Sequence, residues 1–288
     1  MAKNTGERLN KALLRASQKG KSSLAKVKRL VSKGADAKYK ERGTSRSSLG
    51  NAAEAGNLDL VRFLIEEHGV GVDVGTADDA DTPLHLAAAA GHLDVVRYLV
   101  KTGANAKALA SGGDTPLSRA VANGHLDVVR YLVEERGMPL ERKPNQDTML
   151  HLAATCGHLE MVTYLVEHRG LPIEAKDDIG YTPLQKAAIK GRLNVMRYLI
   201  GEKGAHFDAS SELGLTTLRV MKVGHHVRGL RYLKGLQSSK SAGPLAKRPQ
   251  AKAMRSCTAK HARMRIGQPL KGRVVRGRVV KQGRASKR

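Results

Sequence analysis

Apolar residues in the middle of the chain recur in two short blocks that are separated by a glycine. Before Gly91, leucines and paired alanines fill residues 84–88 and give one small apolar face. After it, Leu93, Val96 and Leu99 recur at helical spacing with polar residues between them. Each block matches one face of an α-helix with 3.6 residues per turn. The pattern therefore predicts two short helices, one on each side of Gly91.

The same pair of blocks returns at a nearly fixed interval. The phrase at 91–100 occurs again, unchanged, at 124–133. A Thr or Ser stands nine residues before most of the glycines, whereas Thr216 stands only eight before Gly224, so we expect one residue to be missing from the last unit. A period near 33 indicates a repeat array. The Thr or Ser positions are Ser47, Thr82, Thr115, Thr148 and Thr182, and the glycines are Gly56, Gly91, Gly124, Gly157, Gly191 and Gly224.

Recurring residues at the block ends are those that begin and end helices. Thr82 can accept a hydrogen bond from a free backbone N–H and so cap the first helix. Pro83 follows in the first turn, where its missing N–H costs nothing. Gly91 suits the left-handed conformation that ends a helix. Helices of this length are unstable alone, so stacking on neighbouring units has to stabilise them.

The run Thr82-Pro83-Leu84-His85-Leu86-Ala87-Ala88 resembles the signature of the ankyrin repeat. The resemblance covers roughly residues 10–237 and implies an all-α solenoid of about seven helix-turn-helix repeats. We expect a basic N-terminal segment with a degenerate first repeat at 1–43, the solenoid at 44–237 and a disordered basic tail at 238–288. Extra residues in the linking stretches 66–77, 134–147 and 167–178 predict irregular hairpins or short loops there.

Charge is distributed unevenly along the 288 residues, whose formal net charge is +25. Residues 1–46 carry 14 Lys/Arg and three acids, and 213–288 carry 21 Lys/Arg and no acid. The middle, 47–212, carries 16 Lys/Arg and 23 Asp/Glu and is mildly acidic. An anionic partner is therefore expected at an end of the chain, and not at the repeats.

No motif of an enzyme is present in the sequence. The chain has neither a phosphate-binding glycine loop nor a nucleophile elbow, and most of its 11 histidines occupy repeat slots about one unit apart. We therefore expect a non-catalytic protein without a metal or other cofactor. Cys156 and Cys257 stand in unrelated contexts, and no apolar run is long enough to span a bilayer. These features, with no leader after Met1, predict an intracellular protein, cytoplasmic or nuclear or both.

The resemblance also implies how such a protein works, because ankyrin repeats generally bind other proteins through a concave face of hairpin tips and first-helix residues. The expected function is a protein-protein interaction scaffold, which we expect to be a monomer. Glu212 and Leu215 are expected at the last hairpin tip. The candidate partner-binding residues are Asp78, Asp79, Asp81, Asp114, Asn145, Asp147, Asp178, Ile179, Tyr181, Ile189 and Lys190.

Asp81, Asp114 and Asp147 occupy the same slot in three successive units, so stacking would align them in an acidic column. Two interpretations are open. Asp favours turns because it bonds to nearby backbone groups. Alternatively, the column selects a basic or donor-rich segment of a partner, with an apolar anchor beside it around Ile179, Tyr181 and Ile189.

The tail has three competing interpretations. It is a solubilising or nuclear-targeting segment, or it binds nucleic acid or another anionic surface, or it folds back onto the acidic column and competes with partners. Aromatic residues are absent from it, so any binding of nucleic acid would be sequence-tolerant and strongly salt-dependent. Its repeated basic residues are Arg273, Arg276, Arg278 and Lys281.

Residues 1–46 are also ambiguous. They are basic, Ser-rich and acid-poor, as organelle transit peptides are. Ala12 to Asp36 nevertheless fits a first repeat, and most of the positive charges are Lys. We favour the repeat, and an intact N-terminus on the mature protein would distinguish the two.

Overall fold

The structure of the chain is a computed structural model that describes residues 2–20, 23–41, 47–74, 81–110, 112–140 and 148–241. Within these ranges the regular structure is helical, apart from one isolated antiparallel bridge between Lys40 and Ser47. The chain divides into two units, Met1–Ser238 and Ser239–Arg288. The helices described below belong to the first unit, except for the last residues of α14. The expected disordered tail lies outside the described residues from 242 onward.

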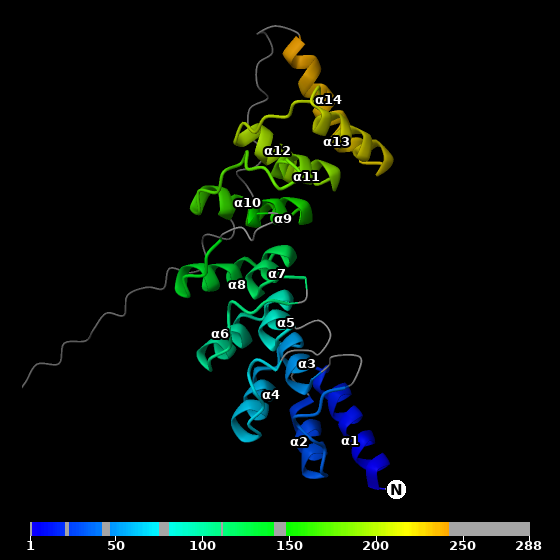
Figure 1. Ribbon diagram of the computed structural model, residues 1–288, viewed down its shortest axis with the longest axis vertical. Helices are drawn as coiled ribbons and strands as arrows, with labels where there is room; N and C mark the ends of the chain where they lie inside the picture. Colours follow the sequence, from blue (N-terminus) through cyan, green and yellow to red (C-terminus); the bar gives the residue numbers. More distant parts are fainter. Residues whose placement is uncertain are drawn as a thin grey trace, which may run out of the picture. The chain divides into compact units, whose positions relative to one another are not determined.

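The helices follow one another as pairs, each with a first and a second helix (Figure 1). The first helices are α1 (Ala2–Ser17), α3 (Ser48–Glu54), α5 (Pro83–Ala90), α7 (Pro116–Asn123), α9 (Met149–Cys156), α11 (Pro183–Ile189) and α13 (Glu212–Val223). The second helices are α2 (Leu24–Ser32), α4 (Leu58–Arg62), α6 (Leu93–Lys101), α8 (Leu126–Arg130), α10 (Leu159–Thr163), α12 (Leu193–Arg197) and α14 (Val227–Ser241). The all-helical architecture predicted from the periodicity is confirmed.

First helices stack directly on one another. Helix α5 packs against α3 and α7, and the same neighbour contacts continue from α7 through α9 and α11 to α13. Leu84, Ala87 and Ala88 of α5 are fully buried in this stack. Alanine permits the close approach, and each buried leucine contributes about 1.5–3 kcal/mol. The stacked first helices thus form one side of a continuous core, to which the second helices also contribute.

The predicted caps are present. Thr115 Oγ1 accepts a hydrogen bond from the Ser118 N–H at 3.1 Å, and Ser118 Oγ accepts one from the Thr115 N–H at 2.9 Å. Thr182 and Gln185 form the same reciprocal pair. At the other end, Gly91 has φ +78°, in the left-handed region. The recurring Thr and Gly therefore act at helix ends as the sequence predicts.

Several second helices end in a π-helical turn that the sequence did not indicate, while the linking stretches 66–77 and 134–147, where we expected irregular hairpins or short loops, lie partly outside the described residues. Helices α4, α8, α10 and α12 each continue into one π-helical turn, at 63–67, 131–135, 164–168 and 198–202. In α4 the closing bond therefore runs from the Val70 N–H to Leu64 O, six residues back. Helix α6 has no π turn, and Ala104 bonds to Leu99, only five back. A π turn absorbs one residue without displacing the core positions on either side.

The last unit corrects a second expectation. Helix α13 begins at Glu212, because Ser211 Oγ accepts from the Gly214 N–H at 3.1 Å and serves as its cap. The cap is therefore not Thr216, and no residue is missing. Helix α13 has 12 residues where α5 has eight, and Leu215 lies within it instead of at a hairpin tip. Its left-handed residue is His225, with φ +55°, one position after the glycine that the sequence suggested.

Second helices are joined along their outer side by arginine-tyrosine contacts. The Arg97 guanidinium lies 4.4 Å from the ring centre of Tyr131 in the next unit, and Arg130 lies 5.3 Å from that of Tyr164. The Tyr164 hydroxyl also donates to Glu134 at 2.9 Å. Such contacts add about 0.5–1 kcal/mol each at partly exposed sites. These contacts join each second helix to the next unit.

Candidate protein-binding surface

The structure describes part of the predicted site. Asp81, Asp114, Asp178, Ile179, Tyr181, Ile189 and Lys190 lie in described ranges. The remaining candidates lie outside the described residues: Asp78, Asp79, Asn145, Asp147, Arg273, Arg276, Arg278 and Lys281.

Asp81 and Asp114 are brought together across adjacent units, and one arginine pairs with both. The Arg119 side chain, from the second turn of α7, places one terminal nitrogen 3.3 Å from Asp81 Oδ1 and its Nε 3.3 Å from Asp114 Oδ2. Ser118 Oγ donates to Asp114 Oδ1 at 3.2 Å. The predicted acidic column is therefore partly neutralised at these two positions by a residue that the sequence analysis did not select.

A signal for this pairing does exist in the sequence. Arg119 stands four residues after the capping Thr115, and Lys186 stands four residues after Thr182. The same slot holds Leu86 in the third unit. An Arg or Lys four residues after the capping Thr, with an Asp in the hairpin just before that Thr, therefore predicts an ion pair within the unit.

Lys186 forms the second such pair with Asp177, which the sequence analysis also missed. The Lys186 Nζ lies 2.8 Å from Asp177 Oδ2, and the Asp177 side chain is only 3% exposed. Asp177 Oδ1 accepts from the N–H groups of Ile179 at 3.0 Å and Tyr181 at 2.7 Å. Burial alone would raise the pKa of the Asp177 carboxyl, but the bonds from Lys186 and the Tyr181 backbone outweigh it and hold that pKa below its ordinary value. The buried Asp177 carboxylate thus holds the hairpin backbone at Ile179 and Tyr181 and pairs with Lys186 of the following helix.

This hairpin presents Ile179 to solvent. The Ile179 side chain is 69% exposed, although isoleucine is usually buried. Tyr181 and Ile189 are half-buried, and Lys190 is exposed. The Lys186 ammonium lies 5.6 Å from the ring centre of Tyr181, so one lysine ties the carboxylate and the ring together. The result is an apolar side chain held outward on a well-bonded turn.

Two sets of histidines bond to backbone carbonyls of a neighbouring unit, and the first set bonds to the hairpins. His85 Nδ1 accepts from the Thr82 N–H at 3.1 Å, and its Nε2 donates to Asp114 O in the next hairpin at 3.1 Å. Burial lowers the pKa of His85 and favours the neutral ring that this pattern requires. His151 likewise donates from Nε2 to Tyr181 O at 2.9 Å. Histidine in this slot therefore holds the next hairpin in place.

The second set packs on the glycines. The His158 ring covers Gly124 of the preceding unit, and its Nε2 donates to Ala122 O at 2.8 Å. His92 and His125 make the same bond to Glu54 O and Ala89 O, at 3.0 and 2.9 Å. These histidines connect one unit to the next, which agrees with the structural role expected for them.

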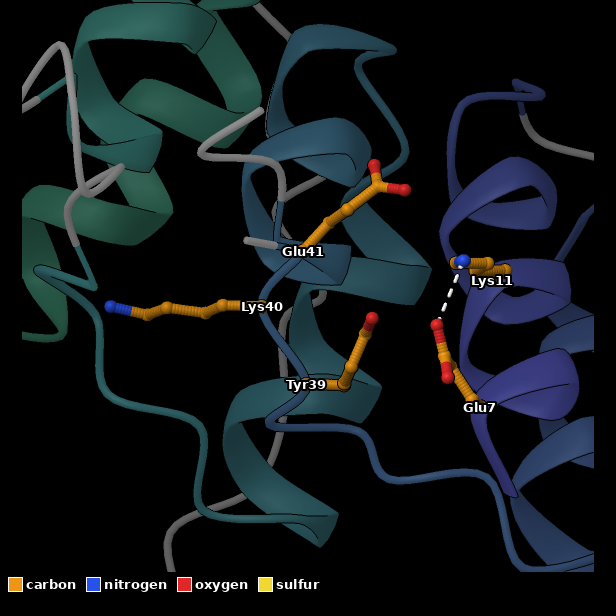
Figure 2. A pocket seen from close by; sticks show the side chains of 5 residues that line it. All are labelled: Glu7, Lys11, Tyr39, Lys40 and Glu41. Atoms are coloured by element: carbon orange, nitrogen blue, oxygen red, sulfur yellow. Dashed lines mark ion pairs between the residues drawn. The ribbon is translucent and has the colours of Figure 1, made fainter. Parts of the chain in front are cut away.

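Two hollows are open on the described surface. One, of about 380 Å³, is lined by Glu7, Lys11, Tyr39, Lys40 and Glu41. Figure 2 shows the Glu7-Lys11 ion pair, 2.8 Å long, on one wall and Lys40 pointing away from it. The other, of about 430 Å³, lies beside Gly124 and contains Asp127, Arg130 and Glu160. Both mix charges of opposite sign and lack the apolar lining typical of small-molecule sites.

Reactive groups are sparse in the described ranges. Within them, no three His, Cys, Asp or Glu side chains come together as metal ligands would. Cys156 is half-buried, and burial raises the pKa of its thiol, which disfavours the reactive thiolate. No helix of those ranges is long and apolar enough to cross a bilayer.

Comparison with known proteins supports the repeat pattern directly. A family model for ankyrin repeats (3 copies) matches residues 13–110, 49–143 and 136–211. No curated protein matches the chain closely enough to name a relative. The family match spans most of the chain and coincides with the stacked helix pairs and with the Thr-capped first helices described above. The chain therefore belongs to the ankyrin repeat family.

Proposed function

We propose that the chain is a non-catalytic scaffold that binds a partner protein through its hairpins and first helices. Ankyrin repeats are generally protein-protein interaction modules and typically lack enzymatic activity. The observation that carries the proposal is Ile179, an exposed apolar side chain on a hairpin that Asp177 holds rigidly. Rigid apolar anchors of this kind dominate binding energies at protein interfaces. The partner would bind inside a cell, in the cytoplasm or nucleus, to a monomer of this chain.

The chemistry of the partner follows from the paired charges near the anchor. Asp81 and Asp114 each share Arg119, so a partner cation has to compete with that arginine. A partner segment whose side chains carry several hydrogen-bond donors, as a planar guanidinium does, can donate to the remaining carboxylate oxygens while Arg119 stays in place. We propose a basic, donor-rich segment with an apolar residue that contacts Ile179. Asp178, beside Ile179 in the hairpin, and Lys190, at the end of α11, would fix the position of this segment along the surface.

The experiment compares three full-length proteins as crosslinking baits in the cell: the natural chain, Ile179→Asp and Val227→Asp. Val227 is 47% exposed and begins the second helix α14, outside the hairpins and first helices, so its substitution is a matched control for surface charge. We expect one saturable partner to be lost with Ile179→Asp and kept with Val227→Asp. Equal retention by both variants would refute the role of Ile179. Loss with both would show that added charge, and not the anchor, disrupts binding.

A second candidate function rests on a different observation. The last 76 residues, 213–288, contain 21 Lys/Arg and no acid, which favours binding to an anionic surface or nucleic acid. The two functions differ in salt dependence. The affinity of the basic segment 213–288 for an anion falls steeply as the salt concentration is raised, whereas the affinity that Ile179 contributes through apolar contact changes much less. Partner retention in high salt therefore distinguishes them.

A further inference from the structure

Helix α13, the first helix of the final pair, has an apolar side that no described element covers. Helices α5, α7, α9 and α11 each lie between two other first helices, whereas α13 has α11 on one side and no following first helix in the described ranges. Its buried residues are Gly214, Thr217 and Met221. Since successive residues are 100° apart on a helix, positions 215, 219 and 223 lie on the opposite side.

Apolar residues on and beside that side are exposed. Leu215 is 46%, Val220 39%, Val223 79% and Val227, the first residue of α14, 47% exposed. These four make up most of the large apolar side chains that are exposed in the described residues. We call them the end-cap apolar patch. Singly exposed apolar residues need no explanation, but a group at one end of a stack indicates a contact surface.

The surroundings of the patch are strongly basic. Arg219 lies between Leu215 and Val223 on the same stripe, and Lys222, Arg228, Arg231 and Lys234 are exposed nearby in sequence. Glu212 is the last acidic residue of the chain. A second copy of this surface, or the chain's own acid-free tail, would bring like charges together. The occupant therefore has to be anionic and has to offer apolar contact.

We propose that the end-cap apolar patch docks on an anionic phospholipid surface. Basic side chains would contact lipid phosphates while the valines and Leu215 enter the boundary between headgroups and acyl chains. Nucleic acid matches the charge but offers no apolar layer, and single strands are usually held by stacking on exposed aromatic rings. Tyr232, the last aromatic residue, is half-buried with the Arg197 guanidinium 5.9 Å from its ring centre. The exposed valines thus favour lipid over nucleic acid. This inference is independent of the function proposed for the hairpins.

The test uses the absence of tryptophan from the natural sequence. Full-length Val223→Trp carries a single fluorescent reporter in the patch, and Leu109→Trp carries one on an exposed hairpin far from it in sequence. Each is mixed with vesicles of phosphatidylserine and phosphatidylcholine, with pure phosphatidylcholine vesicles, with a DNA duplex, and with an acidic amphipathic peptide. We expect a blue shift only for Val223→Trp and only with the phosphatidylserine vesicles.

Sedimentation with the same vesicles supplies the second readout. Val220→Ser combined with Val223→Ser removes apolar surface that is already exposed, so folding is retained and binding falls about tenfold. Leu109→Ser serves as the control and leaves binding unchanged. Four outcomes overturn the proposal: sedimentation that the Ser variants do not weaken, no sedimentation at all, a Val223→Trp shift with DNA, or one with an acidic amphipathic peptide but not with vesicles.

Discussion

Replacing Gly124 by Ala tests whether the glycine-histidine contacts hold the units together. Gly124 has φ +79°, and a Cβ placed there would lie 2.6 Å from Nδ1 of His158 in the next unit. Left-handed backbone costs a non-glycine residue about 1–2 kcal/mol. The ring also has to move and give up its 2.8 Å bond to Ala122 O, at a further cost of about 1–2 kcal/mol. The expected total loss is about 2–4 kcal/mol.

A matched control separates the two costs. Gly103 has φ +99° but nothing within 4 Å of an added Cβ, so Gly103→Ala should lose only the backbone part, about 1–2 kcal/mol. In a His158→Ala background, Gly124→Ala should likewise cost only that part. Urea unfolding followed by far-UV circular dichroism measures each free energy of unfolding. If Gly124→Ala is no more harmful than Gly103→Ala, the ring contact does not stabilise the stack and the reasoning is wrong.

Three further predictions concern named residues. His225→Gly should raise the free energy of unfolding by about 0.5–1 kcal/mol, because His225 holds φ +55° and glycine does so without strain; a melting temperature at or below that of the natural chain would contradict this. The lowered pKa of His85 means that the unfolded chain binds this proton more readily, so the contribution of neutral His85 is present above about pH 6.5 and is lost on acidification below it. His85→Gln keeps the cap, as Gln185 does in its own unit, and should flatten stability against pH between about 5 and 7, measured by thermal melts. Asp177→Asn removes the Lys186 pair and should lower stability by about 1–3 kcal/mol and speed proteolysis at the hairpin, whereas unchanged cleavage would show that Asp177 does not hold the turn.

Local physics alone determined the helix pairs and their ends. Thr115 and Thr182 cap their helices and Gly91 takes the left-handed turn, because each of these preferences depends only on nearby backbone. The repeat length then required stacking, because helices this short are unstable alone. The hairpin positions of Asp114 and Ile179 followed from the same register. In these respects the sequence was sufficient.

Tertiary structure decided what the sequence left open. Helix α4 continues into a π turn at 63–67, which the apolar periodicity of the sequence did not indicate. Arg119 pairs with Asp81, 38 residues away, only because stacking brings two units into contact. The cap of α13 is Ser211, whose Oγ accepts from the Gly214 N–H, a local bond that the repeat spacing did not indicate. Local preferences set the helices of this protein and the exposed position of Ile179, whereas packing between units set the ion pair of Arg119 with Asp81.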